Sequence, residues 1–128
     1  MLRAVDADPS VVVCNSCRFS ADQRENDEGQ RGGALLAQTM PHLSEVAVQE
    51  MPCLFACQRH CTVYVRAKGR IGYVLGDFVP DAAAAQAILE YAALHAKSEE
   101  GVVRYADWPE EVKGHFIVRT PPEGFVAT

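Results

Sequence analysis

The chain has 128 residues and a mass of 14.0 kDa, which is the size of one domain. Hydrophobic residues make up 48% and charged residues 23%, a globular composition that excludes wholesale disorder. The formal net charge of −5 does not suit a general nucleic-acid binder, and no apolar run approaches the roughly 18 residues that cross a bilayer. We therefore expect one soluble, cytoplasmic domain over residues 1–128 that has no export signal and binds neither nucleic acid nor membrane.

The first part of the chain predicts two strands joined by a helix. Residues 11–13 are three valines that lead into Cys14, a pattern typical of a short buried strand. The polar, glycine-rich stretch 19–33 predicts a mobile surface loop, and a helix is expected over residues 33–40. Apolar residues alternate with small or polar ones over 46–49, which predicts a second strand.

A β-hairpin and a long helix are the clearest elements that follow. Residues 62–65 and 71–75 are rich in strand-forming side chains, and Gly69 between them supplies the positive φ that a short turn needs. Asp81 is a good N-cap, because its carboxylate can accept hydrogen bonds from the first free amides of a helix. The alanine-rich residues 82–97 that follow it predict a helix with one apolar face.

The two ends of the chain are expected to be peripheral tails, over residues 1–9 and roughly 103–128, the second with a candidate strand at 116–118. The predicted order is strand, helix, strand, hairpin, helix. This is the order of a thioredoxin-like α/β fold, in which helices flank a mixed β-sheet.

Five cysteines carry the chemical information. Cys14 and Cys17 form a CxxC after the first strand, and Cys53, Cys57 and Cys61 form a C-x3-C-x3-C. An odd number of clustered thiols without an export signal argues against a disulfide framework and favours metal binding or redox chemistry.

The spacings leave several interpretations open. The CxxC alone fits half of a zinc site, a dithiol redox pair or two iron ligands. If residues 53–61 are helical, their three sulfurs lie on one stripe; if they form a turn, Leu54, Phe55 and Ala56 could close an apolar lid over one metal centre. Structural zinc sites favour other spacings, so the three-residue gaps favour iron–sulfur ligation. A dithiol pair would leave three cysteines unexplained.

Residues 52–91 read PCLFACQRHCTVYVRAKGRIGYVLGDFVPDAAAAQAILEY. This segment resembles the C-terminal half of the thioredoxin-like 2Fe–2S ferredoxins, with a C-x3-C, a hairpin with a glycine turn and an acidic-capped helix. The chain is more similar still to a bacterial family of uncharacterised, predicted metal-binding proteins. Its members share the CxxC, the C-x3-C-x3-C and a Gly-Asp step, here Gly76-Asp77. Genes of that family often lie beside genes of aerobic cobalamin biosynthesis.

The resemblance implies an electron-transfer protein rather than an enzyme, with a 2Fe–2S cluster held by Cys14, Cys53 and Cys57. The ferredoxins place their first two ligands farther apart and have four cysteines. The fourth ligand is therefore open: Cys17 is our choice, and Cys61 is the alternative. The resemblance also implies a homodimer and a protein redox partner, which the gene neighbourhood suggests is a corrinoid-pathway enzyme. Two other functions stay open: a zinc- or cobalt-binding module without a redox role, and a thiol–disulfide oxidoreductase that uses Cys14 and Cys17.

Four polar features surround the cysteines in the sequence. His60 is expected to be a turn residue rather than an iron ligand. Arg18 and Arg59 either offset the negative charge of a thiolate-bound cluster or lie in solvent. The loop 19–33 is expected to lie near the cluster as a surface that recognises the partner.

Overall fold

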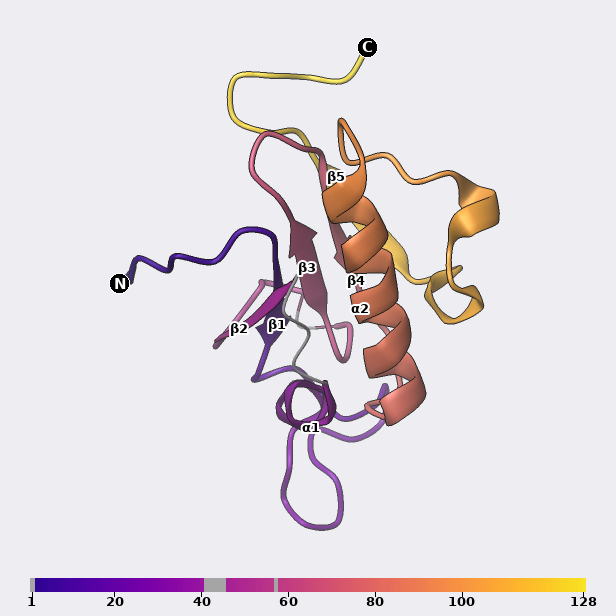
Figure 1. Cartoon of the computed structure of the whole chain (residues 1–128). Coiled ribbons are helices and arrows are strands. Elements are labelled where there is room, and N and C mark those ends of the chain that lie inside the picture. Colours follow the sequence, from indigo (N-terminus) through magenta and orange to yellow (C-terminus); the bar gives the residue numbers. More distant parts are fainter. Residues whose placement is uncertain (1, 41–45, 57) are drawn as a thin grey trace.

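A computed structural model describes residues 2–40, 46–56 and 58–128. Five strands form one sheet in the order β2-β1-β3-β4-β5, with α2 along it and α1 at one end (Figure 1). The elements in chain order are β1 (Ser10–Cys14), α1 (Gly32–Thr39), β2 (Ala47–Met51), β3 (Val63–Arg66), β4 (Gly72–Leu75), α2 (Ala82–Lys97), the 3-10 turns η1 (Tyr105–Asp107) and η2 (Glu110–Val112), and β5 (Phe116–Thr120).

The sheet is mixed. Strand β1 pairs in parallel with β2 and antiparallel with β3, and the pairs β3–β4 and β4–β5 are antiparallel. Because parallel neighbours need a crossover connection, α1 follows β1 before the chain returns as β2. The fold is therefore the predicted α/β class, a mixed sheet with helices in a thioredoxin-like arrangement.

Local sequence explains where these elements begin and turn. The valines of β1 are almost fully buried, as expected for the central region of the sheet. Gly69 has a φ of 73° in the hairpin turn, which is the role predicted for it. The Asp81 carboxylate accepts a hydrogen bond of 2.9 Å from the Ala84 amide, so the predicted N-cap of α2 is confirmed.

The core lies between the sheet and the two helices. Helix α2 contacts β1 and β3, and α1 contacts β1 and α2, which confirms that the apolar face of residues 82–97 packs on the sheet and its hairpin. Leu36 of α1 and Ile88 of α2 are completely buried in this core. Burying a side chain of this size stabilises a fold by about 1.5–3 kcal/mol, so the helices are held mainly by packing.

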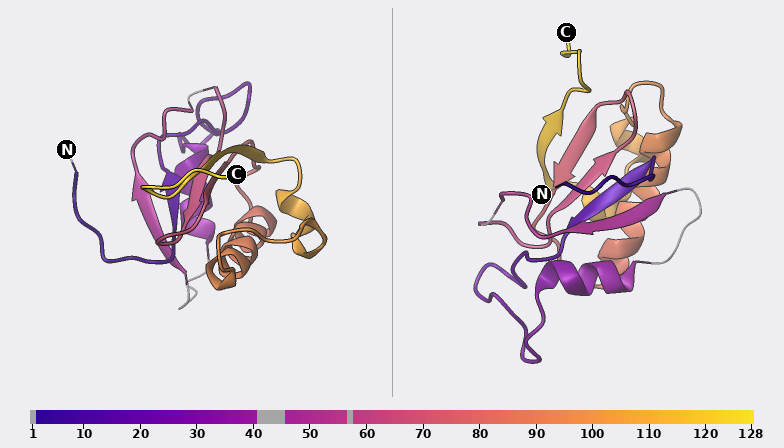
Figure 2. Two further views of the ribbon diagram at one scale, coloured as in Figure 1. Left: turned by 90° about the horizontal axis from the view of Figure 1, so that it is seen from above. Right: turned by 90° about the vertical axis from the view of Figure 1, so that its left-hand side faces the viewer.

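The segment from residue 103 onward is more than the peripheral tail that the sequence predicts. It supplies β5, the edge strand that pairs with β4. Trp108 stacks on Phe116 with ring centroids 4.5 Å apart, and Val112 is fully buried. Figure 2 shows α2 along one face of the sheet with the two 3-10 turns beside it. The apolar residues of this segment thus extend the core past α2.

Residues 2–9 contain no helix or strand, in line with a peripheral start. In the described part of the chain, no helix combines the length and the apolar composition needed to cross a bilayer.

Candidate functional site

Three of the five cysteines line one cavity of about 260 Å³. Cys14 is the last residue of β1, Cys17 lies in the turn after it, and Cys53 follows β2. Because β1 and β2 are parallel, with Cys14 opposite Met51, their C-terminal ends meet at one edge of the sheet. The strand pairing therefore brings the two cysteine groups of the sequence together. The rest of the lining consists of Ser16, Arg18, Arg24, Arg31 and Ala56.

Backbone hydrogen bonds fix the CxxC turn on the strands around it. The Cys14 amide donates to the Thr62 carbonyl at 3.0 Å, and the Cys17 amide donates to the Cys14 carbonyl at 3.3 Å. The Asn15 amide donates to the Met51 carbonyl at 2.9 Å. The turn is thus tied to the start of β3 on one side and to the end of β2 on the other.

A pair of glycines lets α1 begin directly against this turn. A Cβ atom on Gly33 would lie 1.7 Å from the Cys14 carbonyl oxygen, and one on Gly32 would lie 2.3 Å from the Arg18 carbonyl oxygen. Both distances are far below any van der Waals contact, so only glycine permits this approach. The first turn of α1 consequently sets the position of the CxxC.

The thiols of Cys14 and Cys17 are buried, with 3% and 7% of each residue exposed. A hydrogen bond from the Cys17 thiol stabilises the Cys14 thiolate and is the main reason why the pKa of Cys14 falls to about 5, despite the opposing effect of burial. The Leu54 amide and the Ser16 hydroxyl lower this pKa further. The pKa of Cys17 is raised, first because its thiol donates this hydrogen bond to Cys14 and second because it is buried. Cys14 is therefore the thiolate and Cys17 the thiol of the pair.

Thr62 adds a hydrogen-bond donor beside Cys17. Its hydroxyl is buried and has no hydrogen-bond partner among the described residues, so it can donate to a Cys17 thiolate. The Thr62 side chain and amide act against the rise in the pKa of Cys17. The site can therefore stabilise negative charge on both sulfurs once a proton has left.

Cys61 is also buried, but it does not line the cavity. A Cβ on Gly32 would lie 2.8 Å from the Cys61 Sγ, which places this thiol under the start of α1. Burial raises the pKa of Cys61 to about 12, and the charges of Asp77, Asp81 and Cys14 add to the rise. Cys61 is thus a protonated thiol behind the site rather than at its surface.

The segment around Cys53 forms turns, so the helical alternative for residues 53–61 is wrong for the part described. The Phe55 amide donates a hydrogen bond of 3.2 Å to the Cys53 Sγ. Phe55 has a φ of 62° and is 94% exposed, so it does not close the expected apolar lid, whereas Ala56 does line the cavity. Cys57, a predicted ligand, lies outside the described residues.

Two of the polar candidates have partners away from the cavity. His60 donates from Nδ1 to the Phe78 carbonyl at 2.9 Å, which agrees with a turn residue. Arg59 pairs with the Asp77 carboxylate at 2.5 Å and does not line the cavity. Of the two arginines that the sequence singled out, Arg18 lines the cavity of the thiols and Arg59 does not.

Sequence reasoning missed Arg24 and Arg31, which belong to the loop 18–31, here called the arginine loop. The loop is closed by its own hydrogen bonds, for example from the Gln30 amide to the Asn26 side chain at 2.8 Å and from the Phe19 amide to the Arg24 carbonyl at 3.1 Å. Arg31 donates from Nη1 to the Ser16 carbonyl at 2.9 Å, which returns the loop to the CxxC. The described lining contains three arginines and no carboxylate.

The cavity brings together several kinds of group that thiolate-bound metal centres use. The cavity combines three sulfurs, an amide that points at one of them and a cationic wall that offsets thiolate charge. Within the described residues, which leave out Cys57, no three cysteine, histidine or carboxylate side chains stand close enough to hold a single metal ion. A two-iron cluster divides four thiolates between two irons and therefore accepts ligands that are more widely spaced.

Comparison with curated proteins and with solved structures gives no match. The family model described as "Protein of unknown function (DUF1636)" matches residues 11–122, which include every described strand and helix except the first residue of β1. The matched range also includes all five cysteines. The chain therefore belongs to the DUF1636 family.

Proposed function

We propose that the protein holds a 2Fe–2S cluster through cysteine thiolates and transfers single electrons to a partner protein. The convergence of Cys14, Cys17 and Cys53 on one cavity carries this proposal, because two cysteine groups 36 residues apart at their nearest members meet where β1 and β2 end. Cys57, the residue after Ala56 of the cavity wall, completes the proposed ligand set of Cys14, Cys17, Cys53 and Cys57. When bound, the cluster supplies one-electron redox chemistry.

The residues of the chain supply charge balance and burial. Arg18, Arg24 and Arg31 line the same cavity as the thiolates, and their positive charges favour the more negative, reduced state of a bound centre. The Thr62 hydroxyl and the Phe55 amide are donors beside two of the sulfurs. Loading requires Cys17 to lose its proton, so we expect the affinity to rise with pH.

The direct test is purification without oxygen, followed by an absorption spectrum and by analysis of iron, sulfide and zinc. The wild-type protein should contain equal amounts of iron and acid-labile sulfide and absorb visible light. Cys14→Ser and Cys53→Ser should each lose most of this absorption, because a thiolate is removed from a four-ligand site. A protein that takes up no iron and sulfide even after anaerobic reconstitution would refute the proposal, and a colourless protein with bound zinc would establish the metal-binding alternative.

Cys61→Ser is the matched control, since this thiol is buried near the site without lining it. It should keep the cluster. Cys17→Ser should keep a perturbed cluster only if Cys61 replaces it, and the double variant should then lose it. Loss of the cluster in Cys61→Ser together with a normal spectrum in Cys17→Ser would instead make Cys61 the fourth ligand.

A specific observation favours a second candidate function, a thiol–disulfide oxidoreductase. Cys14 and Cys17 are in hydrogen-bond contact, with the first as thiolate and the second as thiol. The Cys14 thiolate would attack a disulfide of the substrate, forming a mixed disulfide and releasing one substrate thiolate. Cys17 would then give up its proton, attack the Cys14 sulfur and release the second substrate sulfur as the Cys14–Cys17 disulfide forms. Two electrons and the Cys17 proton thus pass to the substrate, and water supplies the second proton.

An assay of metal-free protein distinguishes the two proposed functions. Rapid reduction of a disulfide substrate that Cys14→Ser and Cys17→Ser abolish, while Cys53→Ser leaves it intact, would favour the oxidoreductase. Cys53 is the informative control, because it lines the cavity but has no place in the dithiol reaction.

The remaining expectations rest on the resemblance described above and stay proposals. They are a homodimer in the cytoplasm and a corrinoid-pathway enzyme as the electron acceptor. The arginine loop lies beside the thiols, and this position supports its proposed role as the surface that the partner contacts.

A further inference from the structure

A second cavity, of about 400 Å³, lies at the opposite end of the sheet from the cysteines. In the β1–β3 register Val13, next to Cys14, pairs with Val63, whereas Ser10 pairs with Arg66 beside this cavity. In Figure 1 the β3–β4 turn lies at the top with the C-terminal segment, and the arginine loop lies at the bottom. The two cavities therefore share no lining residue and can be tested separately.

Three cations from the hairpin line this second cavity: Arg66, Lys68 and Arg70. Two carboxylates, Asp8 and Glu123, also belong to the lining, so the balance of formal charge is positive in a chain whose net charge is −5. The Asp8 carboxylate accepts the Lys68 amide at 2.7 Å, which fixes its position in the wall without removing its charge. The three cations still outnumber the two acids, so the formal charge of the lining is positive.

The side chains of Arg66 and Arg70 are each held in place by a hydrogen bond from Nε. Arg66 donates from Nε to the Ser10 hydroxyl at 3.1 Å, and its guanidinium lies 5.9 Å from the centre of the Tyr64 ring. Arg70 donates from Nε to the Ser98 carbonyl at 2.8 Å. Within the described residues, the Arg66 Nη groups make no hydrogen bond, and Arg70 makes one of 3.5 Å from Nη1 to the Lys68 carbonyl. The outer donors of two oriented guanidinium groups are therefore available to a ligand.

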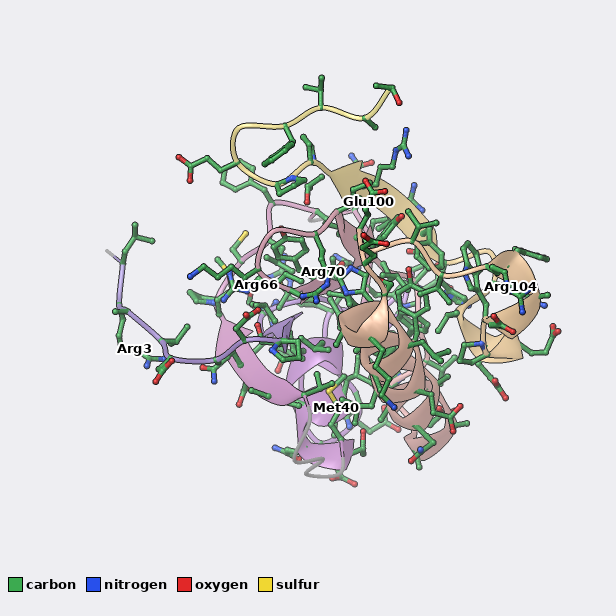
Figure 3. The ribbon with its side chains drawn as sticks, turned by 45° about the horizontal axis from the view of Figure 1, so that its top comes forward. Arg3, Met40, Arg66, Arg70, Glu100 and Arg104 are labelled. Atoms are coloured by element: carbon green, nitrogen blue, oxygen red, sulfur yellow. The ribbon has the colours of Figure 1, made fainter. Side chains whose placement is uncertain are left out.

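We propose that this cavity binds a small anion that carries at least two negative charges on oxygen, as a phosphate ester or a polycarboxylate does. Two guanidinium groups oriented through Nε and an ammonium group offer more charged donors than a single carboxylate can accept, so a ligand with several anionic oxygens matches them better. The volume lies within the range of small-molecule sites. In Figure 3 Arg66 and Arg70 lie next to each other, whereas Arg104 lies at the far side of the molecule.

Calorimetric titration of the full chain with pyrophosphate, citrate and acetate at low ionic strength tests this site. Pyrophosphate or citrate should bind saturably to wild type, and the tighter of the two identifies phosphate or carboxylate as the ligand group; acetate should bind at least roughly tenfold more weakly than that anion. Arg66→Gln and Lys68→Gln should each weaken that binding roughly tenfold or more, since each removes a charged donor. Lys68→Gln keeps the fold, because the Lys68 side chain is exposed and only its backbone bonds Asp8.

Arg104→Gln is the matched control, an exposed arginine paired with Asp107 outside the cavity. It should bind the anions as wild type does. The proposal is overturned if neither pyrophosphate nor citrate binds saturably, if acetate binds equally well, or if Arg104→Gln weakens binding as much as Lys68→Gln. Amide chemical-shift changes that cluster at Gly69 and the hairpin during the titration would support this location, and changes confined to the arginine loop would contradict it.

Discussion

Gly33→Ala is the sharpest test of how α1 positions the CxxC turn. The new Cβ would stand 1.7 Å from the Cys14 carbonyl oxygen, 2.8 Å from its carbon and 3.2 Å from the Asn15 Cα. All three are backbone atoms, so no side-chain rotation relieves the contact. Either the start of α1 or the Cys14 peptide must move by more than an ångström.

Overpacking of this kind costs about 1–3 kcal/mol, and the better helix propensity of alanine recovers at most about 1 kcal/mol. We therefore expect a net loss of about 1–2 kcal/mol in the free energy of unfolding, seen as a fall of about 0.5–1 M in the midpoint of urea denaturation. Because the Cys14 carbonyl accepts the Cys17 amide, we also expect an altered thiol pair, with slower alkylation of Cys14 near neutral pH in metal-free protein.

The matched control is Gly76→Ala. Its Cβ would lie 2.7 Å from the Cδ1 of Ile117, the flexible end of a side chain, so a rotamer change can absorb it. This variant should unfold within about 0.5 kcal/mol of wild type. A Gly33→Ala protein with wild-type stability and wild-type Cys14 reactivity would show that the glycine contact does not position the turn.

Three further predictions concern titrating groups. Cys17→Ala removes the hydrogen bond that stabilises the Cys14 thiolate, so the midpoint of alkylation against pH in metal-free protein should rise by more than about one unit; an unchanged midpoint would contradict this. Burial lowers the pKa of His95, so below pH 6.5 the unfolded chain binds a proton that the folded chain does not. This group should therefore lower the free energy of unfolding by up to about 1.4 kcal/mol for each unit that the pH falls. In urea titrations at pH 7.5 and 5.5, the difference in stability between the two pH values should be smaller for His95→Gln than for wild type. Asp81→Ala should lower the free energy of unfolding by about 1 kcal/mol because the helix cap is lost, whereas Asp81→Asn keeps the cap; equal losses in the two variants would argue against the capping role. Both variants remove a negative charge and should therefore lower the pKa of Cys61 in a thiol titration.

The elements of the fold could be predicted because each is encoded locally. A run of valines, a glycine in a short turn and an aspartate before an alanine-rich stretch each determine structure within a few residues. The packing of residues 103–128 could not be predicted in the same way. Trp108 and Phe116 meet only because β5 returns to pair with β4, which is a contact between distant parts of the chain.

The candidate site could be predicted only in part, because some of its residues follow a local pattern and others come together through the fold. The spacing of the cysteines predicted that the two groups form one site, and the parallel pairing of β1 and β2 brings Cys14 and Cys53 to one cavity. Arg24 and Arg31 lie in a polar stretch whose sequence resembles solvent-exposed loop, and nothing local indicates that the loop turns back. The adjacent glycines at 32 and 33 were the available signal, since a Gly-Gly pair at a helix start indicates close backbone approach.

The closure of the arginine loop at its base has a consequence for how this region can change. Arg18 and Arg31 stand at the two ends of the loop beside the thiols, while the exposed turn around Gly29 is closed separately by the bond from the Gly29 amide to the Asn26 carbonyl at 3.0 Å. Doubling the length of a flexible loop costs only about 0.6 kcal/mol in closure entropy. Insertions at this turn should therefore leave the thiol cavity intact, which makes it a suitable position for a fluorescent label or an affinity tag and a place where related chains can differ in length without losing the site.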